Sequence, residues 1–496
     1  MKLFKKIAGF ILAFAMILAI AMPSVVMAAD TTYKLTLQNT VEGHTYEVYQ
    51  VFSGTLSTKN NKKVLSDLKW GSGVKADAYT ETAKAKAETL TDETTARAFA
   101  KELVNQKKLS AATKTVQSTT GTTEIAGLAA GYYLVKDTDS SLANKNDSYT
   151  AYILQVVGDA TTSVKSDVPS SEKKVKDIND STDTETTEWQ DAADWDIGDE
   201  VPFKIEGTLP SNYDKYKKYT LKFHDKEEEG LTFKSETVKV FIDNTEITEG
   251  FRVVVNPEDN DTFGVVFDNL KTTSAKNNSV IRVEYKSVLN EKANLGKPGN
   301  KNTMYMEFSN NPNNEQGGEF GKTPDDTVIV FTYKVDVNKV DEQGNKLTGA
   351  EFTLEKKIKG TKDTWKAITK VSGTADDVFE FKGIDDGEYR LTETRAPANY
   401  DKLSDPIYFT VTAGHVDGAN PYLDTFSGNI TSGNVGTMTF TANKDSGILS
   451  TKVVNKPGSS LPETGGMGTT ILYVAGAVMI LAAGAFLVMQ KKAEDK

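Results

Sequence analysis

The middle four hundred residues of this chain consist of short stretches in which apolar and polar residues alternate. Residues 33–37 and 46–52 show the pattern, and Gly, Asn and Asp residues separate such stretches. A period of two places apolar side chains on one face of a strand, and many strands separated by turns are typical of β-sandwiches. We therefore predict a mainly β fold. Residues 76–108 differ, because they are rich in Ala, Lys, Glu and Thr and predict one or two helices.

The N-terminus has the pattern of a secretory signal peptide. The apolar run 7–22 follows three basic residues, Lys2, Lys5 and Lys6. Val26-Met27-Ala28 provides the small residues expected at a cleavage site. We predict a signal peptide over residues 1–29 and a secreted protein.

The C-terminus has the pattern of a membrane-spanning helix. Residues 471–489 carry no charge, and Lys491 and Lys492 follow them. At about 1.5 Å per helical residue this stretch is long enough to cross a hydrocarbon core of about 30 Å. The two lysines would stay on the cytoplasmic side.

Charge and cysteine content narrow the function classes. The net charge is −11 at pH 7, and the two terminal segments are net positive, so the remaining body is more acidic still. Nucleic-acid binding is excluded on this basis, since phosphate contacts need clustered Lys or Arg. The chain has no cysteine, so disulfides cannot brace this extracellular protein.

Composition changes divide the body into three domains. A polar, Pro-containing stretch at 164–171 ends the first alternating region, and the β-branched run 328–330 ends the second. Residues 456–460 form a flexible stalk. We predict domains at 30–168, 169–333 and 334–456, followed by a C-terminal segment at 457–496.

The motif Leu461-Pro462-Glu463-Thr464-Gly465 precedes the apolar C-terminal stretch. It resembles the LPxTG sorting signal of Gram-positive surface proteins. In those proteins a sortase cysteine attacks the Thr carbonyl, releases everything from Gly onward and passes the acyl group to an amine. The resemblance implies that Thr464 becomes the mature C-terminus and that the protein is anchored in the cell wall.

Further motifs resemble the three domains of SpaA-type backbone pilins, and together they cover nearly the whole chain. The first domain is similar to the N-terminal domain of major pilins at 43–54, 70–71 and 131–137. The second resembles the fimbrial isopeptide-forming D2 domain, a collagen-adhesin A-type sandwich, at 194–199, 225–233 and 302–312. The third is similar to the collagen-adhesin B-type domain at 338–341, 347–352, 389–400 and 453–455, with Asn399 where the family has Gly. This resemblance implies tandem immunoglobulin-like β-sandwiches, the first with a helical insert.

Domains of this kind form an amide between Lys and Asn side chains beside a carboxylic acid. Burial disfavours charge, so the Lys becomes a neutral, nucleophilic amine and the protonated acid can polarise the Asn carbonyl. In the last domain the resemblance implies Lys339 as nucleophile, Asn455 as electrophile and Glu393 as proton shuttle.

The middle domain offers alternatives for the same chemistry. Asp225 fits the position of the acid. Among the candidate lysines Lys173, Lys174 and Lys176, alternation favours Lys173, because it shares its face with the apolar Val175. Asn302 and Asn310 both share the face of 304, 306 and 308, and we prefer Asn302 because Asn310 lies in a Ser-Asn-Asn-Pro turn. Whether the first domain has its own amide stays open.

Pilin families also use a linker lysine that accepts the Thr acyl group of another subunit. Lys165 resembles that lysine, although the usual Tyr-Pro-Lys-Asn motif is absent and Lys173 and Lys174 are nearby. A linker Lys stays exposed and can reach a sortase. The implied partners are a class C pilin sortase, a housekeeping sortase, other copies of the chain, minor pilins and peptidoglycan.

Other motifs indicate no metal or cofactor site. Residues Asp177, Asn179, Ser181 and Glu188 have the spacing of a calcium loop, but Thr182 stands where the turn requires Gly. His44, His224 and His415 match no metal spacing, and no phosphate loop or Ser/His/Asp set is present. We therefore expect a surface pilus subunit that supports adhesion and is not an enzyme. The alternative is a monomeric LPxTG-anchored adhesin that binds a host matrix protein; the sequence identifies no receptor.

Overall fold

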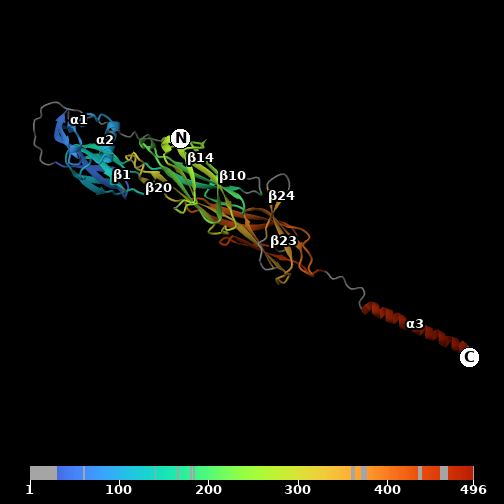
Figure 1. Cartoon of the computed structure of the whole chain (residues 1–496). Coiled ribbons are helices and arrows are strands. Elements are labelled where there is room, and N and C mark those ends of the chain that lie inside the picture. Colours follow the sequence, from blue (N-terminus) through green and yellow to red (C-terminus); the bar gives the residue numbers. More distant parts are fainter. Residues whose placement is uncertain are drawn as a thin grey trace, which may run out of the picture.

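The computed structural model describes residues 31–59, 62–139, 141–164, 167–178, 181, 185–257, 259–358, 364–369, 377–433, 438–458 and 467–494 of the 496-residue chain. The described part is mostly strand, so the prediction of a mainly β fold is confirmed. The molecule is elongated, with β-sandwiches one after another and a single helix at the far end (Figure 1). The predicted signal peptide, Lys165 and the LPxTG-like motif lie outside the described residues.

The first domain is a sandwich of two sheets. One has the order β5-β1-β8, and the other has the order β3-β2-β6-β7 with β4 paired to β2. Leu35 of the first sheet and Tyr46, Val48 and Val135 of the second are fully buried in the core between them. The strands are β1 (Tyr33–Thr40), β2 (Thr45–Lys59), β3 (Lys62–Trp70), β4 (Lys114–Gln117), β5 (Gly121–Leu128), β6 (Gly131–Asp137), β7 (Ala151–Val156) and β8 (Ala160–Ser163).

A helical insert covers the outer face of the larger sheet, as the composition of residues 76–108 predicts. It contains the 3₁₀ turn η1 (Ala76–Ala78) and the helices α1 (Ala83–Glu88) and α2 (Glu93–Asn105). Asp92 caps α2 by accepting the Thr95 N–H, which satisfies one of the free donors at the helix start. Phe99 packs against Phe52 with ring centroids 5.9 Å apart, so the insert shares a core with the sheet.

The middle domain is a larger sandwich. One sheet has the order β10-β9-β12-β18-β14-β15, and the facing sheet has the order β11-β21-β19-β13-β17-β16 with β20 paired to β19. Side chains of β12 and β19 alternate between buried and partly exposed, so each strand turns one face to the core. The elements are β9 (Ser170–Ile178), β10 (Glu185–Gln190), β11 (Ala192–Asp194), β12 (Glu200–Thr208), η2 (Tyr213–Lys215), β13 (Leu221–Glu227), β14 (Leu231–Ile242), β15 (Thr245–Ile247), β16 (Arg252–Val255), β17 (Phe263–Phe267), η3 (Leu270–Thr272), β18 (Val280–Leu289), β19 (Asn300–Ser309), β20 (Phe320–Lys322) and β21 (Asp326–Phe331).

The last domain is a sandwich of sheets β25-β22-β30-β29 and β24-β23-β26-β27-β28. Its first strand, β22, runs parallel to its last strand, β30, with Lys339 opposite Val453. The chain therefore enters and leaves this domain along adjacent strands. The strands are β22 (Tyr333–Val340), β23 (Glu351–Ile358), β24 (Thr364–Ile368), β25 (Val378–Ile384), β26 (Gly387–Arg395), β27 (Ile407–Val416), β28 (Tyr422–Ser432), β29 (Phe440–Asn443) and β30 (Ile448–Val454).

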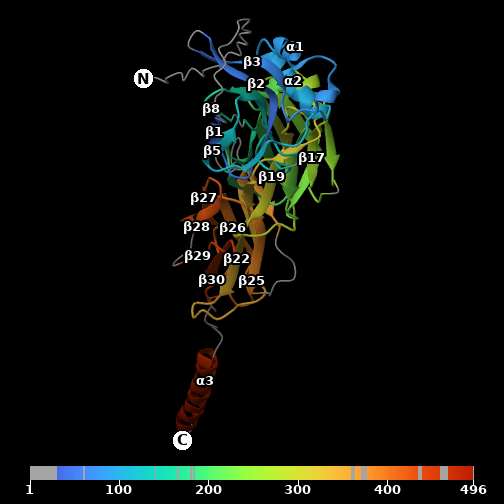
Figure 2. The ribbon, with the colours of Figure 1, turned by 90° about the vertical axis from the view of Figure 1, so that its left-hand side faces the viewer.

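Backbone hydrogen bonds join the first domain to the middle domain. The Tyr149 N–H donates to the carbonyl of Asn310 (2.8 Å), and the Asn310 side-chain amide donates to the carbonyl of Leu142 (2.9 Å). The Asn144 N–H donates to the backbone carbonyl of Phe320 on β20 (2.9 Å). In the view of Figure 2 the first and middle domains overlap, and the last domain and the C-terminal helix follow below them.

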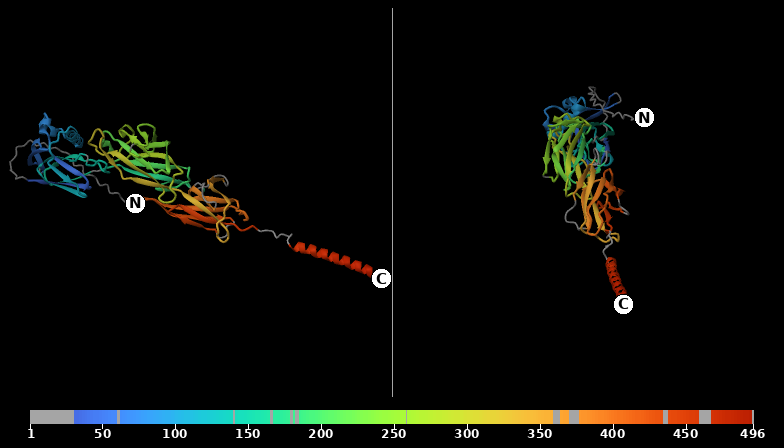
Figure 3. Two further views of the ribbon diagram at one scale, coloured as in Figure 1. Left: turned by 60° about the horizontal axis from the view of Figure 1, so that its bottom comes forward. Right: turned by 90° about the vertical axis from the view of Figure 1, so that its right-hand side faces the viewer.

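The middle and last domains meet over a close backbone contact. Gly296 has φ +57°, and a Cβ there would lie 2.2 Å from the backbone N of Gly447, so only glycine fits. The apolar core of the last domain includes Ala192, Ile329 and Phe331 from the middle domain. Figure 3 shows the two domains in line, with the C-terminal helix beyond them.

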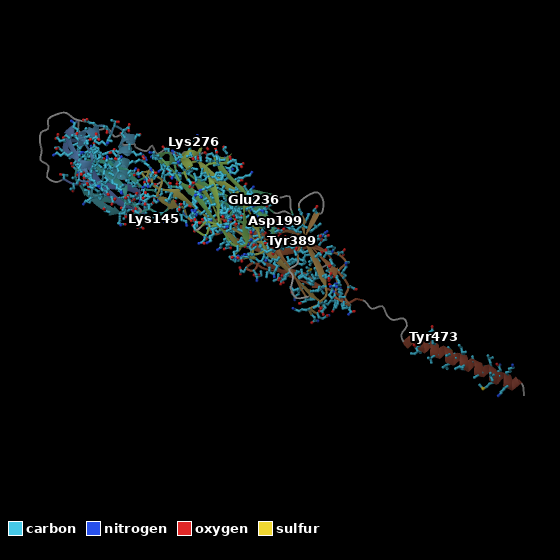
Figure 4. All side chains as sticks on the ribbon, in the orientation of Figure 1. Lys145, Asp199, Glu236, Lys276, Tyr389 and Tyr473 are labelled. Atoms are coloured by element: carbon cyan, nitrogen blue, oxygen red, sulfur yellow. The ribbon has the colours of Figure 1, made fainter. Side chains whose placement is uncertain are left out.

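The final element is α3 (Met467–Glu494). Within it, Thr470–Ala493 has a mean hydropathy of 2.5 and is not covered by other parts of the protein. Tyr473 marks its first turns in Figure 4. Its length and composition suit a membrane span, as the sequence predicts.

Candidate functional site

The last domain contains a buried cluster of a lysine, a carboxylic acid and an asparagine. Lys339 is on β22, and Asn455 directly follows the parallel neighbour β30. Glu393 comes from β26 in the facing sheet. The side chains of Lys339 and Glu393 are fully buried, and Asn455 is 1 % exposed. The structure thus brings together the three residues that the sequence resemblance implied for this site.

The amide of Asn455 is held by the acid. Its Nδ2 donates to both carboxylate oxygens of Glu393 (3.0 and 3.1 Å) and to the carbonyl of Asp401 (2.8 Å). The Lys339 Nζ donates to the Val453 carbonyl (2.7 Å) and lies 4.0 Å from Glu393 Oε1. The buried Asn455 Oδ1 has no hydrogen-bond partner within the described part of the chain.

Burial lowers the pKa of Lys339 to about 8, against a smaller opposing effect of Glu393. A substantial fraction of this amine is therefore neutral at physiological pH. A neutral lysine amine has a free lone pair and is a nucleophile.

The middle domain contains a second cluster of the same composition. Lys173 lies on β9, and Asp225 and Asn302 lie on β13 and β19 of the facing sheet. All three side chains are fully buried, whereas Lys174 and Lys176 are partly exposed. Asn310 lies at the contact with the first domain, where its amide binds Leu142. The structure therefore places Asn302, and not Asn310, with Lys173.

Tyr285 on β18 connects the members of this second cluster. The Lys173 Nζ donates to Asp225 Oδ2 and to the Tyr285 hydroxyl, the latter at 2.6 Å. The hydroxyl donates to Asp225 Oδ2 (2.9 Å) and accepts from Asn302 Nδ2 (2.9 Å). Asn302 Nδ2 also donates to Glu227 Oε1 (3.3 Å).

The electrostatics of this cluster favour neutral groups. Burial lowers the pKa of Lys173 and raises that of Asp225. Burial, with the nearby Asp225 charge, also raises the pKa of Glu227 to about 8. An amine beside a protonated acid is the state that amide formation requires.

Sequence reasoning missed two members of the middle cluster. Glu227 is two residues after Asp225 on β13, so the same alternation that oriented Asp225 could have identified it. Tyr285 had no such signal, because the core of this domain also buries Tyr213, Tyr216 and Tyr219.

A third buried lysine, also missed, lies where the middle and last domains meet. The Lys356 Nζ on β23 donates to Asp385 of the last domain and to Asp196 of the middle domain, the latter at 3.2 Å. Asp196 Oδ1 accepts the backbone N–H of Asp385 (3.0 Å). Figure 4 labels Tyr389, whose hydroxyl donates to the Asp385 carbonyl (3.0 Å), near this junction. A buried ion pair therefore links the two domains.

The first domain contains a buried lysine and a buried histidine, both next to carboxylates. Lys136 pairs with Asp139 (2.9 Å) and Glu47 (3.1 Å). His44 lies between Asp137 (2.8 Å) and Asp147 (2.7 Å). Burial alone would lower the pKa of His44, but the two carboxylates raise it to about 9.

Two groups of side chains in the described residues have the composition of metal ligands. The atoms of Asp177, Asp194 and His415 lie within 4.8 Å of one another at the junction of the middle and last domains. Burial lowers the pKa of His415 to about 4, so its imidazole is neutral. The second group contains His224, Asp259 and Asp261, where Lys222 already pairs with Asp259 (2.7 Å).

Comparison with known proteins places this geometry in context. Residues 333–421 match the SpaA family of prealbumin-like fold domains, and residues 453–496 match the LPXTG cell wall anchor motif. The chain is 26 % identical over 436 residues to the trypsin-resistant surface T6 protein of Streptococcus pyogenes serotype M6, covering 74 % of this chain and 75 % of that protein. The chain is an LPXTG-anchored surface protein of the pilin type.

Solved pilin structures share the fold. The T6 backbone pilin of S. pyogenes serotype M6 matches with a TM-score of 0.58 at 20 % identity, over 88 % of this pilin and 100 % of that chain. The full-length major pilin SpaD of Corynebacterium diphtheriae matches with a TM-score of 0.51 at 18 % identity, over 87 % and 99 %. These relatives are structural subunits of pili.

Proposed function

We propose that this pilin is the repeating subunit of a covalent surface fibre with an internal amide in each of its last two domains. In the fibre, Thr464 of one subunit is joined to Lys165 of another. A class C sortase makes this bond, a housekeeping sortase attaches the fibre to peptidoglycan, and minor pilins complete it. The observation that carries the internal amides is the burial of one lysine, one acid and one asparagine together in each domain.

Each internal bond forms by the same balanced reaction. The neutral Lys Nζ attacks the Asn Cγ, the bond from Cγ to Nδ2 breaks, and one ammonia leaves. The acid takes a proton from the amine and supplies one to the leaving nitrogen. In the last domain Glu393 contacts Asn455 Nδ2 directly, so it is placed to do this.

The strand arrangement gives the bond in the last domain a mechanical role. Tension along a fibre enters this domain on β22 and leaves on β30. These strands are parallel neighbours, so an amide from Lys339 to Asn455 joins the end of the first strand to the residue that follows the last strand. The strands between them are then shielded from the load.

The T6 relative supports this proposal through one property in its name, trypsin resistance. Closed loops of chain inside packed sandwiches expose few extended segments to a protease. Crosslinks of this kind also restrict the unfolded chain, as disulfides do, but a reducing environment does not break them.

Two measurements test the proposal. Wall extracts boiled in detergent should give a ladder of high molecular weight, whereas a single band would support the monomeric adhesin instead. The intact mass of the recombinant body should be two ammonias below the sequence mass. A body with the full sequence mass would exclude both internal amides.

A further inference from the structure

The two amide clusters differ in how the acid reaches the asparagine. In the last domain, both oxygens of Glu393 accept hydrogen bonds from Asn455 Nδ2. In the middle domain, the partners of Asp225 Oδ2 are Lys173 and Tyr285, and its Oδ1 has no hydrogen-bond partner among the described residues. The shorter aspartate therefore contacts the amine but not the nitrogen that must leave as ammonia.

The Tyr285 hydroxyl connects Asp225 to that nitrogen. It lies 2.6 Å from Lys173 Nζ, 2.9 Å from Asp225 Oδ2 and 2.9 Å from Asn302 Nδ2, so it touches the nucleophile, the acid and the leaving group. A phenol has one proton to donate and two lone pairs to accept with, and these three contacts use all of them. Glu227 holds the other side of the amide through Asn302 Nδ2 (3.3 Å).

We propose that Tyr285 is a catalytic residue of the middle domain, and that its hydroxyl relays a proton from Asp225 to the departing nitrogen of Asn302. The inference rests on the proposed amide between Lys173 and Asn302. It assigns a second proton-transfer group to this domain, where the last domain uses Glu393 alone.

The steps balance in atoms and charge. Asp225 first takes a proton from the Lys173 ammonium, and the neutral Nζ attacks the Cγ of Asn302. Asp225 then passes its proton to the Tyr285 oxygen while the phenol passes its own proton to Nδ2. The bond from Cγ to Nδ2 breaks, ammonia leaves, and Asp225 removes the remaining extra proton from Nζ. Tyr285 ends as it began.

The surroundings of Tyr285 keep its hydroxyl protonated before and after the reaction. Burial raises the pKa of Tyr285 well above its usual value, so a phenolate does not form at neutral pH. The ring is fixed by stacking on Phe203 (centroids 5.4 Å apart) and by the edge of Phe263 (4.8 Å). Removing the oxygen alone leaves these aromatic contacts in place.

The test follows loss of ammonia by intact mass at successive times after a short, cold expression of the mature body. Wild type should lose two ammonias. Tyr285→Phe should lose the ammonia of the last domain at the wild-type rate and the second about 100-fold more slowly, the smallest contribution usual for a positioned acid or base. Tyr219→Phe is the matched control, because Tyr219 is buried in the same core and its hydroxyl has no partner within the described residues. It should behave as wild type.

The outcomes separate the relay from the amide itself. Wild type that never loses the second ammonia would overturn the proposed amide of the middle domain. A second ammonia lost equally fast by wild type and Tyr285→Phe would leave the amide in place and overturn the relay. If Tyr285→Phe does not fold, the wild-type rate in mixtures of light and heavy water decides. Two protons moving together give a curved dependence on deuterium content, and a straight line would overturn the relay.

Discussion

Replacing Glu393 with glutamine removes one proton carrier from the last domain and keeps the size of the side chain. The glutamine oxygen can still accept the Leu403 N–H that Glu393 accepts at 2.8 Å. A carboxamide cannot take a proton from Lys339 or give one to Asn455. We therefore expect Glu393→Gln to fold, to keep the ammonia of the last domain and to lack its amide.

The chain-entropy argument gives the size of the effect on stability. The amide from Lys339 to Asn455 would close a loop of about 120 residues, and a crosslink of that span stabilises a domain by about 5 kcal/mol. In a domain of this size each kcal/mol moves the melting temperature by about 4 °C. The last domain of Glu393→Gln should therefore melt about 20 °C below that of wild type.

Calorimetry and intact mass on the same samples provide the assay. Glu388→Gln is the matched control, because Glu388 is on the same strand, exposed, and pairs with Lys357 at the surface (2.8 Å). Surface pairs contribute at most about 1 kcal/mol, so this control should keep both ammonia losses and melt close to wild type. The reasoning is refuted if Glu393→Gln still loses both ammonias, or if it lacks the amide and melts with wild type.

Three further perturbations have defined outcomes. In Asn302→Ala, Lys173 has no Asn302 side chain to react with, so the body should lose only one ammonia. Asn310→Ala should lose two ammonias. The reverse result would assign the bond to Asn310. The pKa of His44 is raised from 6.5 to about 9, so its stabilisation of the first domain is complete below pH 6.5 and is lost as pH rises through 9. Urea unfolding of wild type should show the free energy of unfolding of the first domain falling over this pH range. The same fall in His44→Gln would contradict the role given to His44. Lys356→Met leaves two buried carboxylates without their cation and should cost about 3–5 kcal/mol in urea unfolding. Lys357→Met on the same strand is the control, and equal losses in both variants would argue against the junction ion pair.

The sequence predicts the elements of this fold well because burial follows the alternation of side chains. The alternation of side chains between the two faces of a strand is enough to separate Lys173 from Lys174 and Lys176. In the structure Lys173 is buried and the other two are partly exposed. The helical insert was visible for a different reason, since its composition departs from that of the strands. Local pattern is sufficient for such features.

Contacts between distant segments were beyond this reasoning. The alternation of side chains along the strand allowed both Asn302 and Asn310. Only the packing of the first domain on β19 and β20 shows that the side chain of Asn310 bonds to Leu142 instead. The ion pair of Lys356 with Asp196 joins residues of different domains. Tyr285 is one of several buried tyrosines, and its role depends on which side chains the facing sheet presents to it.

The central claim is that the subunits of the fibre are joined by amide bonds, and branched peptides test it most directly. Tryptic digests of native fibres purified from the cell wall can be sequenced by mass spectrometry. The account predicts a peptide in which the acyl group of Leu-Pro-Glu-Thr, ending at Thr464, is carried by the side chain of Lys165. Fibres in which Thr464 is found only on peptidoglycan, with every lysine of the chain unmodified, would contradict it.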